Sequence, residues 1–200
     1  LFVYNDVFIP DRTDYILGKS DVNPLPYIVE GIGILEKVGC DYAAMTCNTA
    51  HYFYDEIQKS VNIPVINMVE AAVEYAKEQI SSVRKIGILA TDGTVKSGVY
   101  EKVIKKHGLE CEVPSDENQK EVMNIIYNQV KAGNKVNLYG FMNIIEELRD
   151  KGCDAIILGC TELSVINKDF NLSMESHDII DAMQALARKC ITLCGKKIKE

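Results

Sequence analysis

The chain has 200 residues, of which 47% are hydrophobic and 26% are charged, and its formal net charge is -7. This composition is typical of a globular protein and excludes a largely disordered chain. The negative charge argues against a nucleic acid or an anionic membrane as a partner, because both attract basic surfaces. No apolar run approaches the roughly 20 residues that a membrane-spanning helix needs.

Strand-like apolar runs alternate with helical patterns along the whole chain. The expected strands are residues 1–6, 42–47, 63–68, 85–91, 109–114 and 154–160. The expected helices are residues 27–39, 48–59, 69–80, 95–108, 118–132, 136–151 and 178–197, with a short polar link before the last one. Strands that alternate with helices of this length predict an α/β fold, with parallel sheets covered on both faces.

An internal repeat is the most informative feature of the sequence. Residues 39–47 read GCDYAAMTC and residues 152–160 read GCDAIILGC, so each copy has Gly-Cys-Asp, a short apolar strand and a final cysteine. Each copy follows an amphipathic helix that ends at the glycine, which suits the left-handed conformation common at helix C-termini. The repeat predicts two pseudo-symmetric lobes with Cys47 and Cys160 facing a shared cleft at the carboxyl ends of the strands.

The repeat also suggests how the chain is divided. We expect residues 1–84 and 178–200 to form the first lobe and residues 85–177 to form the second. In the second half, a strand, a glycine-containing turn and a helix begin at KIGILATDGT, and the first half has no counterpart. We therefore expect an N-terminal strand and helix, a unit of roughly 30 residues, to be missing from the first lobe.

Cys47 and Cys160 are placed for acid–base chemistry. A thiol at the end of a strand and the start of a helix is easily ionised, because the helix N-terminus stabilises negative charge. One thiolate can remove a proton from a substrate carbon while the opposite thiol delivers a proton to the other face. Such a pair inverts the configuration of that carbon without a cofactor, whereas a single base returns the proton to the side from which it came.

The other cysteines and the histidines have simpler interpretations. Seven cysteines without a secretory leader predict free thiols and a cytoplasmic protein. Buried free cysteines usually pack as small hydrophobic residues, and we interpret the remaining ones in this way: Cys40, Cys111, Cys153, Cys190 and Cys194. The spacing of Cys47 and His51 resembles a metal-ligand pair but lacks a second pair, so we expect no metal and place His51 in the pocket wall or at a helix cap. His107 is expected to complement a helix C-terminus.

Several segments resemble the aspartate/glutamate racemase family, especially its aspartate racemase branch. These are IPDRT (9–13), CNTAH (47–51), TDGT (91–94), VKAG (130–133) and GCTEL (159–163). The resemblance implies two Rossmann-like lobes with the active site between them, racemisation of an acidic amino acid without pyridoxal phosphate, metal or other cofactor, and a homodimer. Family members begin with a strand and a glycine-rich turn, which this sequence lacks.

The resemblance also implies roles for individual residues. Cys47 and Cys160 match the catalytic cysteines, of which the first usually serves the D enantiomer and the second the L enantiomer. The residues that it implies for substrate binding are Arg12, Asn48, Thr49, Thr91, Gly93, Thr94, Lys131, Thr161 and Glu162. Arg12 and Lys131 are the cations for the side-chain carboxylate, although a turn-stabilising ion pair of Arg12 and a solvated Lys131 are the simpler alternatives. Glu162 stands where glutamate racemases have a histidine, which favours aspartate.

Other functions remain open at this point. A hydantoin racemase or a maleate isomerase would keep the two thiols and change the substrate. A neutral hydantoin is disfavoured by the two cations, whereas maleate, a dianion, is not. A decarboxylase of the same superfamily would need only one of the cysteines. A non-catalytic amino-acid-binding domain is the alternative from another class, and it would bind its ligand without exchanging the α-proton.

Overall fold

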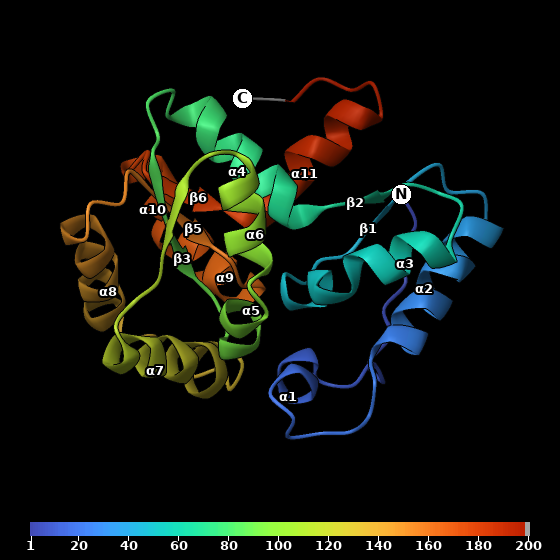
Figure 1. Ribbon diagram of the computed structural model, residues 1–200, viewed down its shortest axis with the longest axis horizontal. Coiled ribbons are helices and arrows are strands. Elements are labelled where there is room, and N and C mark those ends of the chain that lie inside the picture. The colour runs from blue at the N-terminus through green and yellow to red at the C-terminus, as the bar shows by residue number, and fades with distance from the viewer. Residues whose placement is uncertain (199–200) are drawn as a thin grey trace.

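The computed structural model of the chain describes residues 1–198 and has two α/β lobes (Figure 1). The first lobe is built around a two-stranded parallel sheet, in which Ala43 pairs with Val65. Its elements are α1 (Arg12–Ile16), α2 (Leu25–Lys37), β1 (Ala43–Ala44), η1 (Thr49–Phe53), α3 (Tyr54–Ser60) and β2 (Val65–Ile66). Figure 1 shows these elements on one side of the molecule and the larger sheet on the other.

The second lobe contains a four-stranded parallel sheet with the strand order β4-β3-β5-β6. The strands are β3 (Lys85–Leu89), β4 (Glu110–Glu112), β5 (Ala155–Leu158) and β6 (Ile179–Asp181). The helices are α4 (Met68–Gln79), α5 (Asp92–Ser97), α6 (Val99–Lys106), α7 (Asp116–Asn124), η2 (Ile125–Val130), α8 (Leu138–Asp150), α9 (Thr161–Phe170), α10 (Leu172–Glu175) and α11 (Ala182–Leu193).

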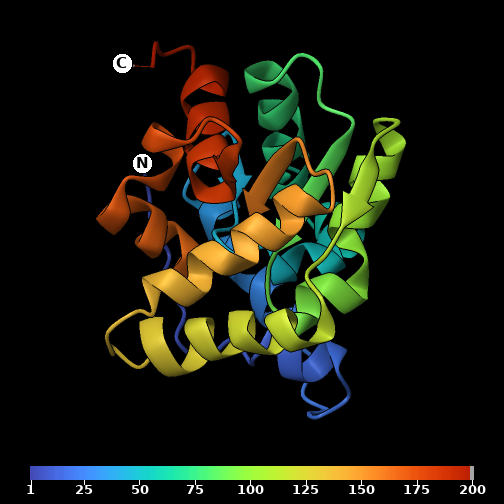
Figure 2. The same ribbon diagram turned by 90° about the vertical axis from the view of Figure 1, so that its left-hand side faces the viewer.

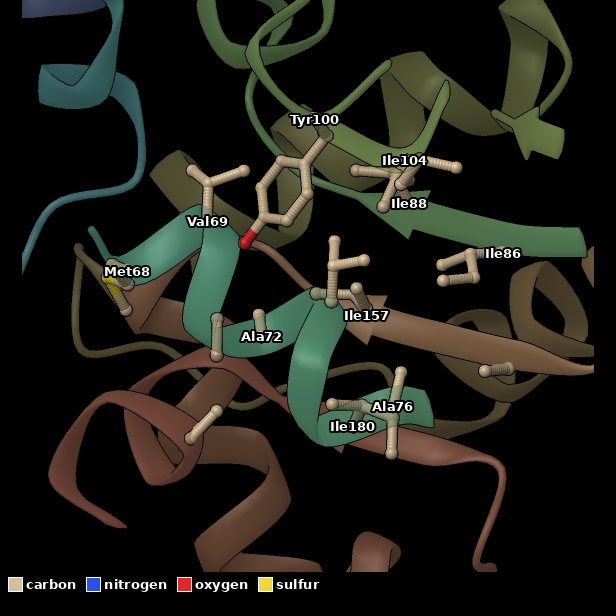
Figure 3. Close-up of a cluster of buried hydrophobic side chains, with 14 of the residues drawn as sticks. Met68, Val69, Ala72, Ala76, Ile86, Ile88, Tyr100, Ile104, Ile157 and Ile180 are labelled. Atoms are coloured by element: carbon tan, nitrogen blue, oxygen red, sulfur yellow. The ribbon is translucent and has the colours of Figure 1, made fainter. Parts of the chain in front are cut away.

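Helices cover both faces of the larger sheet. Ile86, Ile88 and Ile157 point to one face, where they pack with α4, α6 and α11 in a cluster that also includes Tyr100 (Figure 3). Ile156 and Leu158 point to the opposite face and pack with α7, η2, α8 and α9. Figure 2 views the molecule from this second side, with α7, η2 and α8 drawn yellow to orange. The continuous apolar run of β5 follows from burial on both faces, and the predicted two-lobed α/β fold is confirmed.

The two copies of the repeat adopt the same local conformation. Gly39 and Gly152 follow α2 and α8 and have positive φ angles of 86° and 82°. This left-handed conformation ends each helix and is easily adopted only by glycine. β1 and β5 then lead to Cys47 and Cys160, so the repeat places each thiol just after a parallel strand.

The structure corrects several predicted element boundaries. The predicted helix 95–108 is split into α5 and α6, because Gly98 has a left-handed φ of 66°. The polar link expected before the last helix contains α9 and α10, and residues 1–6 form no strand. The last helix starts at Ala182 and not at residue 178, because residues 179–181 pair with β5 as the edge strand β6.

The pairing of β6 also bears on the lobes. The predicted division assigns residues 1–84 and 178–200 to the first lobe, whereas α4 packs against the four-stranded sheet of the second lobe and β6 is part of that sheet. The last two residues of the second range lie outside the described part of the chain. Between residues 1 and 198, no helix is long and apolar enough to cross a membrane.

Candidate active site

Cys47 and Cys160 line one small cavity to which both lobes contribute. Cys47 lies in the loop between β1 and η1, and Cys160 is the N-cap residue of α9, two residues after the end of β5. The cavity has a volume of about 70 Å³. Pockets for drug-sized ligands measure roughly 300–1,000 Å³, so this one suits a far smaller molecule. The carboxyl ends of parallel strands are the edge at which α/β proteins bind ligands, as the repeat predicts.

The cavity brings together the predicted site residues except Gly93 and Thr94. Those that line it are Arg12, Cys47, Asn48, Thr49, Thr91, Lys131, Cys160, Thr161 and Glu162. Lining residues that the sequence analysis missed are Asp11, Thr13, Thr46, Tyr127 and Gly159. All of these except Tyr127 are sequence neighbours of residues that it did identify, so proximity along the chain could have indicated them.

Arg12 lies beside the Cys47 thiol. Its Nη1 donates to the carbonyl oxygens of Pro10, at 3.1 Å, and Ile9, at 3.4 Å, which holds the guanidinium against the start of α1. Burial lowers the pKa of Arg12, but the negative charges around it, that of Cys47 first and then those of Asp11 and Tyr127, raise it overall. Within residues 1–198, Arg12 forms no ion pair with an acidic side chain. Its charge is therefore directed at Cys47 and the cavity.

Cys160 has the opposite environment. Its Sγ–H donates to Oε2 of Glu162 at 2.9 Å, and the same oxygen accepts from Oγ1 of Thr161 at 3.0 Å. Burial raises the pKa of Cys160 well above its ordinary value, and the adjacent Glu162 carboxylate raises it further. Cys160 is therefore held as a protonated thiol although it caps a helix, whose N-terminus alone would favour the thiolate.

Four threonine hydroxyls form a buried network beneath the cavity. Oγ1 of Thr91 lies 3.2 Å from that of Thr13, 3.3 Å from that of Thr49 and 3.1 Å from that of Thr94. The Oγ1 atoms of Thr49 and Thr94 are 2.7 Å apart. These side chains come from α1, η1 and the start of α5, so the network joins the two lobes. Thr94 supports two lining residues and does not itself line the cavity.

Gly93 allows α1 to lie directly on α5. A Cβ atom added at this glycine would be 2.7 Å from Cα of Thr13, a distance that side chains do not tolerate against backbone. The structure therefore places Gly93 behind the cavity wall, where it permits close packing, and not among the lining residues. This packing carries Arg12 and Thr13 to the thiols.

Replacing Gly93 by alanine should destabilise the protein and reduce its activity together. Overpacking of this kind typically costs about 1–3 kcal/mol, and displacement of α1 would also move Arg12. Urea unfolding measures the stability. Gly33→Ala is the matched control, because a Cβ at Gly33 in α2 meets no atom within 4 Å. The control should be neutral or stabilised by up to about 1 kcal/mol, and equal behaviour of the two variants would contradict the packing role.

Tyr127 and Lys131 reach the cavity from η2, a short π-helix. The backbone N–H of Lys131 bonds to the carbonyl of Ile126, five residues earlier, and π-helical turns are often found at functional sites. Nζ of Lys131 lies 4.1 Å from the centre of the Tyr127 ring and 3.9 Å from Oε1 of Glu162. Burial raises the pKa of Tyr127 to about 12. Lys131 is thus held at the cavity and is not a freely solvated side chain.

Asn48 presents an unusual polar group next to Cys47. Its side chain is 3% exposed, and its Oδ1 accepts a hydrogen bond from the hydroxyl of Tyr100 at 2.5 Å. Among the described residues, its Nδ2 has no hydrogen-bond partner. An unsatisfied buried amide costs about 1–3 kcal/mol, so such a group in a cavity wall indicates a place for an acceptor from a ligand.

His51 connects the Cys47 loop to α4. Its Nε2 lies 2.9 Å from the backbone N–H of Met68 and must accept there, so Nδ1 carries the proton and donates to the carbonyl oxygen of Cys47 at 2.9 Å. Burial lowers the pKa of His51, which keeps the ring neutral. Both nitrogens are therefore engaged within the protein. In the region that the structure describes, no group of three or more potential ligands is arranged for a metal ion.

A larger cavity of about 810 Å³ lies between η1, α4 and α6 and contains neither thiol. The charged side chains along it are paired with each other. Lys106 lies 3.3 Å from Glu70, and Lys102 lies 3.8 Å from Asp55. The greater volume therefore does not make it the better candidate, because a catalytic site needs reactive groups that point into it.

Comparison with known proteins agrees with these features. A sequence model described as "Asp/Glu/Hydantoin racemase" matches residues 1–190. The broad specificity amino-acid racemase RacX of Bacillus subtilis (strain 168) is 30% identical over 165 residues, which cover 82% of this chain and 70% of that protein. The glutamate racemase of Aquifex pyrophilus is 28% identical over 177 residues, which cover 88% of this chain and 67% of that protein.

Two solved structures are also similar over nearly the whole chain. The Picrophilus torridus aspartate racemase has a TM-score of 0.81 and 31% identity, and the match covers 98% of this chain and 80% of that chain. An aspartate racemase homologue from Pyrococcus horikoshii OT3 has a TM-score of 0.76 and 27% identity, and the match covers 98% of this chain and 83% of that chain.

Proposed function

The chain belongs to the Asp/Glu/Hydantoin racemase family of amino-acid racemases, and from this premise we propose that it interconverts the enantiomers of aspartate by a two-cysteine acid–base reaction. The observation that carries the proposal is the opposite environment of two thiols in one cavity. Cys47 lies beside the cation Arg12, and Cys160 donates to the carboxylate of Glu162. A cation beside one thiol and a carboxylate beside the other suit a pair in which one sulfur accepts a proton and the other donates one.

The reaction needs one proton to leave and one to arrive. The Cys47 thiolate takes the α-proton, so that the C–H bond breaks and an S–H bond forms. The Cys160 thiol then gives its proton to the opposite face of the same carbon and becomes a thiolate. The product has the inverted configuration, and the reverse reaction uses the two sulfurs in exchanged roles. The thiolate left on Cys160 faces the negative Glu162, which favours its return to the protonated state.

The charges and donors of the cavity support an acidic amino acid as the substrate. Arg12 and Lys131 provide positive charge for a second carboxylate, which supports a dicarboxylic amino acid over a neutral hydantoin. The unpartnered Nδ2 of Asn48 supplies a donor for a carboxylate close to Cys47. Aspartate is preferred to glutamate in this proposal because both well-matched structures are described as aspartate racemases or their homologues. The expected homodimer stays a prediction.

The decisive test follows the α-proton. L-aspartate incubated with the protein in deuterated water should lose its α-proton NMR signal while its circular dichroism signal decays to zero. D-aspartate should reach the same racemic end point. Loss of the NMR signal without decay of optical activity would indicate exchange by one base, and loss of neither would refute the proposal. Maleate, L-glutamate and a hydantoin in parallel reactions distinguish the related enzymes.

Replacing Glu162 by glutamine should move the pH dependence in a defined direction. Cys160 delivers a proton only as a thiol, so the reaction that uses it as the acid is lost as pH rises through its pKa. Burial and Glu162 raise that pKa, so Glu162→Gln should shift this alkaline limb to lower pH and reduce the rate by about tenfold. For the opposite enantiomer Cys160 is the base, and the acid limb should also shift to lower pH. Initial rates for each enantiomer across pH measure both limbs.

Glu101→Gln is the control for this charge change. Glu101 pairs with Lys105 at 2.6 Å on α6, and it does not line the cavity. Replacing Glu101 should leave both the acid and the alkaline limb of the pH–rate profile in place. Unchanged limbs in the Glu162 variant would show that this carboxylate does not control Cys160.

A further inference from the structure

Tyr100 connects the two thiol-bearing loops from a position that does not touch the cavity. It belongs to α6 in the second lobe, and its side chain is 2% exposed within the cluster shown in Figure 3. In that view the ring lies among apolar side chains, with the hydroxyl at the end away from Ile104. This hydroxyl donates to Oδ1 of Asn48, which follows Cys47 in the first lobe.

The hydrogen bond from Tyr100 is made to the oxygen of the Asn48 amide, which defines the orientation of that amide. An amide has an accepting oxygen on one side and a donating NH₂ group on the other. Because Oδ1 is turned toward the Tyr100 hydroxyl, Nδ2 is turned away from it. Nδ2 is buried without a partner, and Asn48 lines the cavity that holds both sulfurs. Two N–H donors are therefore left for a ligand, and a carboxylate matches them whereas an ammonium group does not.

The Tyr100 ring also contacts the second thiol loop. A Cβ atom added at Gly159 would lie 3.0 Å from Cε2 of Tyr100, so the ring rests directly on the residue before Cys160. One side chain thus contacts the residue after the first thiol and the residue before the second. Burial raises the pKa of Tyr100, and the nearby Asp181 and Cys160 raise it further, so the phenol keeps the proton that it donates to Asn48.

We propose that Tyr100 is a positioning residue that holds the Asn48 amide with its NH₂ group toward the cavity, as the donor for the α-carboxylate of the substrate. The inference rests on the proposed function and deepens it, because it identifies what gives that part of the cavity its preference for a carboxylate. Tyr100 acts through Asn48 and does not itself touch the substrate. The Tyr100 hydroxyl, and not only the ring, is therefore required to orient the Asn48 amide.

Tyr100→Phe should weaken the binding of L-aspartate by about tenfold, the typical effect of one lost hydrogen bond. Isothermal titration measures the Kd, and steady-state kinetics should show the change mainly in KM. Tyr54→Phe is the matched control, because the Tyr54 hydroxyl donates to the carbonyl oxygen of Val65 at 2.9 Å, outside the cavity. The control should lose some thermal stability and keep its Kd.

A double-mutant cycle separates positioning from general stability. In the Asn48→Ala background, Tyr100→Phe should change the Kd by less than about twofold, because the amide that it orients is gone. An equal loss in both backgrounds, or no loss in either, would overturn the inference. Asn48→Asp, which keeps Tyr100 in place, gives a second test. Its outward carboxylate oxygen should repel the substrate, so tighter binding by this variant than by Asn48→Ala would also overturn it.

These results are distinguishable from failure of the proposed function. If Tyr100 has no positioning role, the wild-type protein still exchanges the α-proton of aspartate, and the double-mutant cycle shows no coupling between Tyr100 and Asn48. If the wild-type protein neither binds aspartate nor exchanges its α-proton, the proposed function fails, and the inference that rests on it fails too.

Discussion

Replacing either Cys47 or Cys160 by serine should reduce racemisation by about a thousandfold or more. A serine hydroxyl is a far weaker acid than a thiol, so the variant loses the base or the acid at that face, and each such group is worth roughly 10²–10⁴ in rate. The remaining cysteine can still remove and return a proton on its own face. Each variant should therefore exchange the α-proton of one enantiomer with solvent without inverting it, and the two variants should act on opposite enantiomers.

The repeat provides the control for this experiment. Cys40 lies in the same copy as Cys47, follows the helix-ending glycine Gly39 and does not line the cavity. Cys40→Ser should keep racemisation within about twofold of the wild type, since the half-buried Cys40 does not line the cavity and the change from sulfur to oxygen is small. Normal racemisation by either single variant, or an equal loss in Cys40→Ser, would contradict the two-cysteine reaction. Circular dichroism and α-proton NMR measure inversion and exchange separately.

The thiol pair could be predicted because the relevant constraints are local. Gly39 and Gly152 end helices in the left-handed conformation, and each is followed by a short strand and, two or three residues after that strand, by a cysteine. Parallel strands direct their carboxyl ends to the same edge, so two matched copies suffice to place both sulfurs at a shared cleft. Neither step needs knowledge of side-chain packing.

The contacts that support the site could not be predicted in the same way, because they join residues that are far apart in the sequence. Thr13 and Thr91 are 78 positions apart, and Tyr100 and Asn48 are 52 apart. Nothing near Tyr100 in the sequence distinguishes it from an ordinary core aromatic residue. Gly93 illustrates the reverse case: the motif TDGT suggests a binding residue, whereas the geometry shows a close backbone approach to Thr13.

The boundaries of the last elements were missed for a related reason. Ile179 and Ile180 read equally well as the start of an amphipathic helix, but their burial beside β5 makes them a strand. Asp181 then starts α11 as its N-cap, accepting from the backbone N–H groups of Met183 and Gln184. The same carboxylate accepts from Ser164 and Asn167 of α9, so this helix start is fixed by contacts with another element.

The two cysteines of the cavity have neighbours of opposite charge. The two sulfurs are chemically identical, and the chain distinguishes them by placing a cation beside one and an anion beside the other. Arg12 has two tasks in this scheme, because it supports a negative sulfur and also attracts a carboxylate of the substrate. Replacing Arg12 by a neutral residue should therefore reduce activity more than replacing it by lysine, which keeps the charge and loses the planar guanidinium.

Arg12→Gln should reduce kcat/KM for aspartate by about a hundredfold, through both a lower kcat and a higher KM. The neutral amide can form hydrogen bonds but supplies no charge to the thiolate or to the substrate, and charged hydrogen bonds are the strong ones. Arg12→Lys keeps the charge and loses the planar fork, so it should cost about tenfold, mainly in KM. Initial rates with each enantiomer, analysed for kcat and KM, distinguish the two variants.

Arg188→Gln is the control for loss of a positive charge. Arg188 lies over the Tyr75 ring, with its guanidinium carbon 5.0 Å from the ring centre, and does not line the cavity. Its replacement should leave both kinetic constants unchanged. If Arg12→Lys were as inactive as Arg12→Gln, the fork geometry and not the charge would be the requirement. If Arg12→Gln kept the wild-type kcat, the proposed support of the Cys47 thiolate would be wrong, because a cation needed only for substrate binding would affect KM alone.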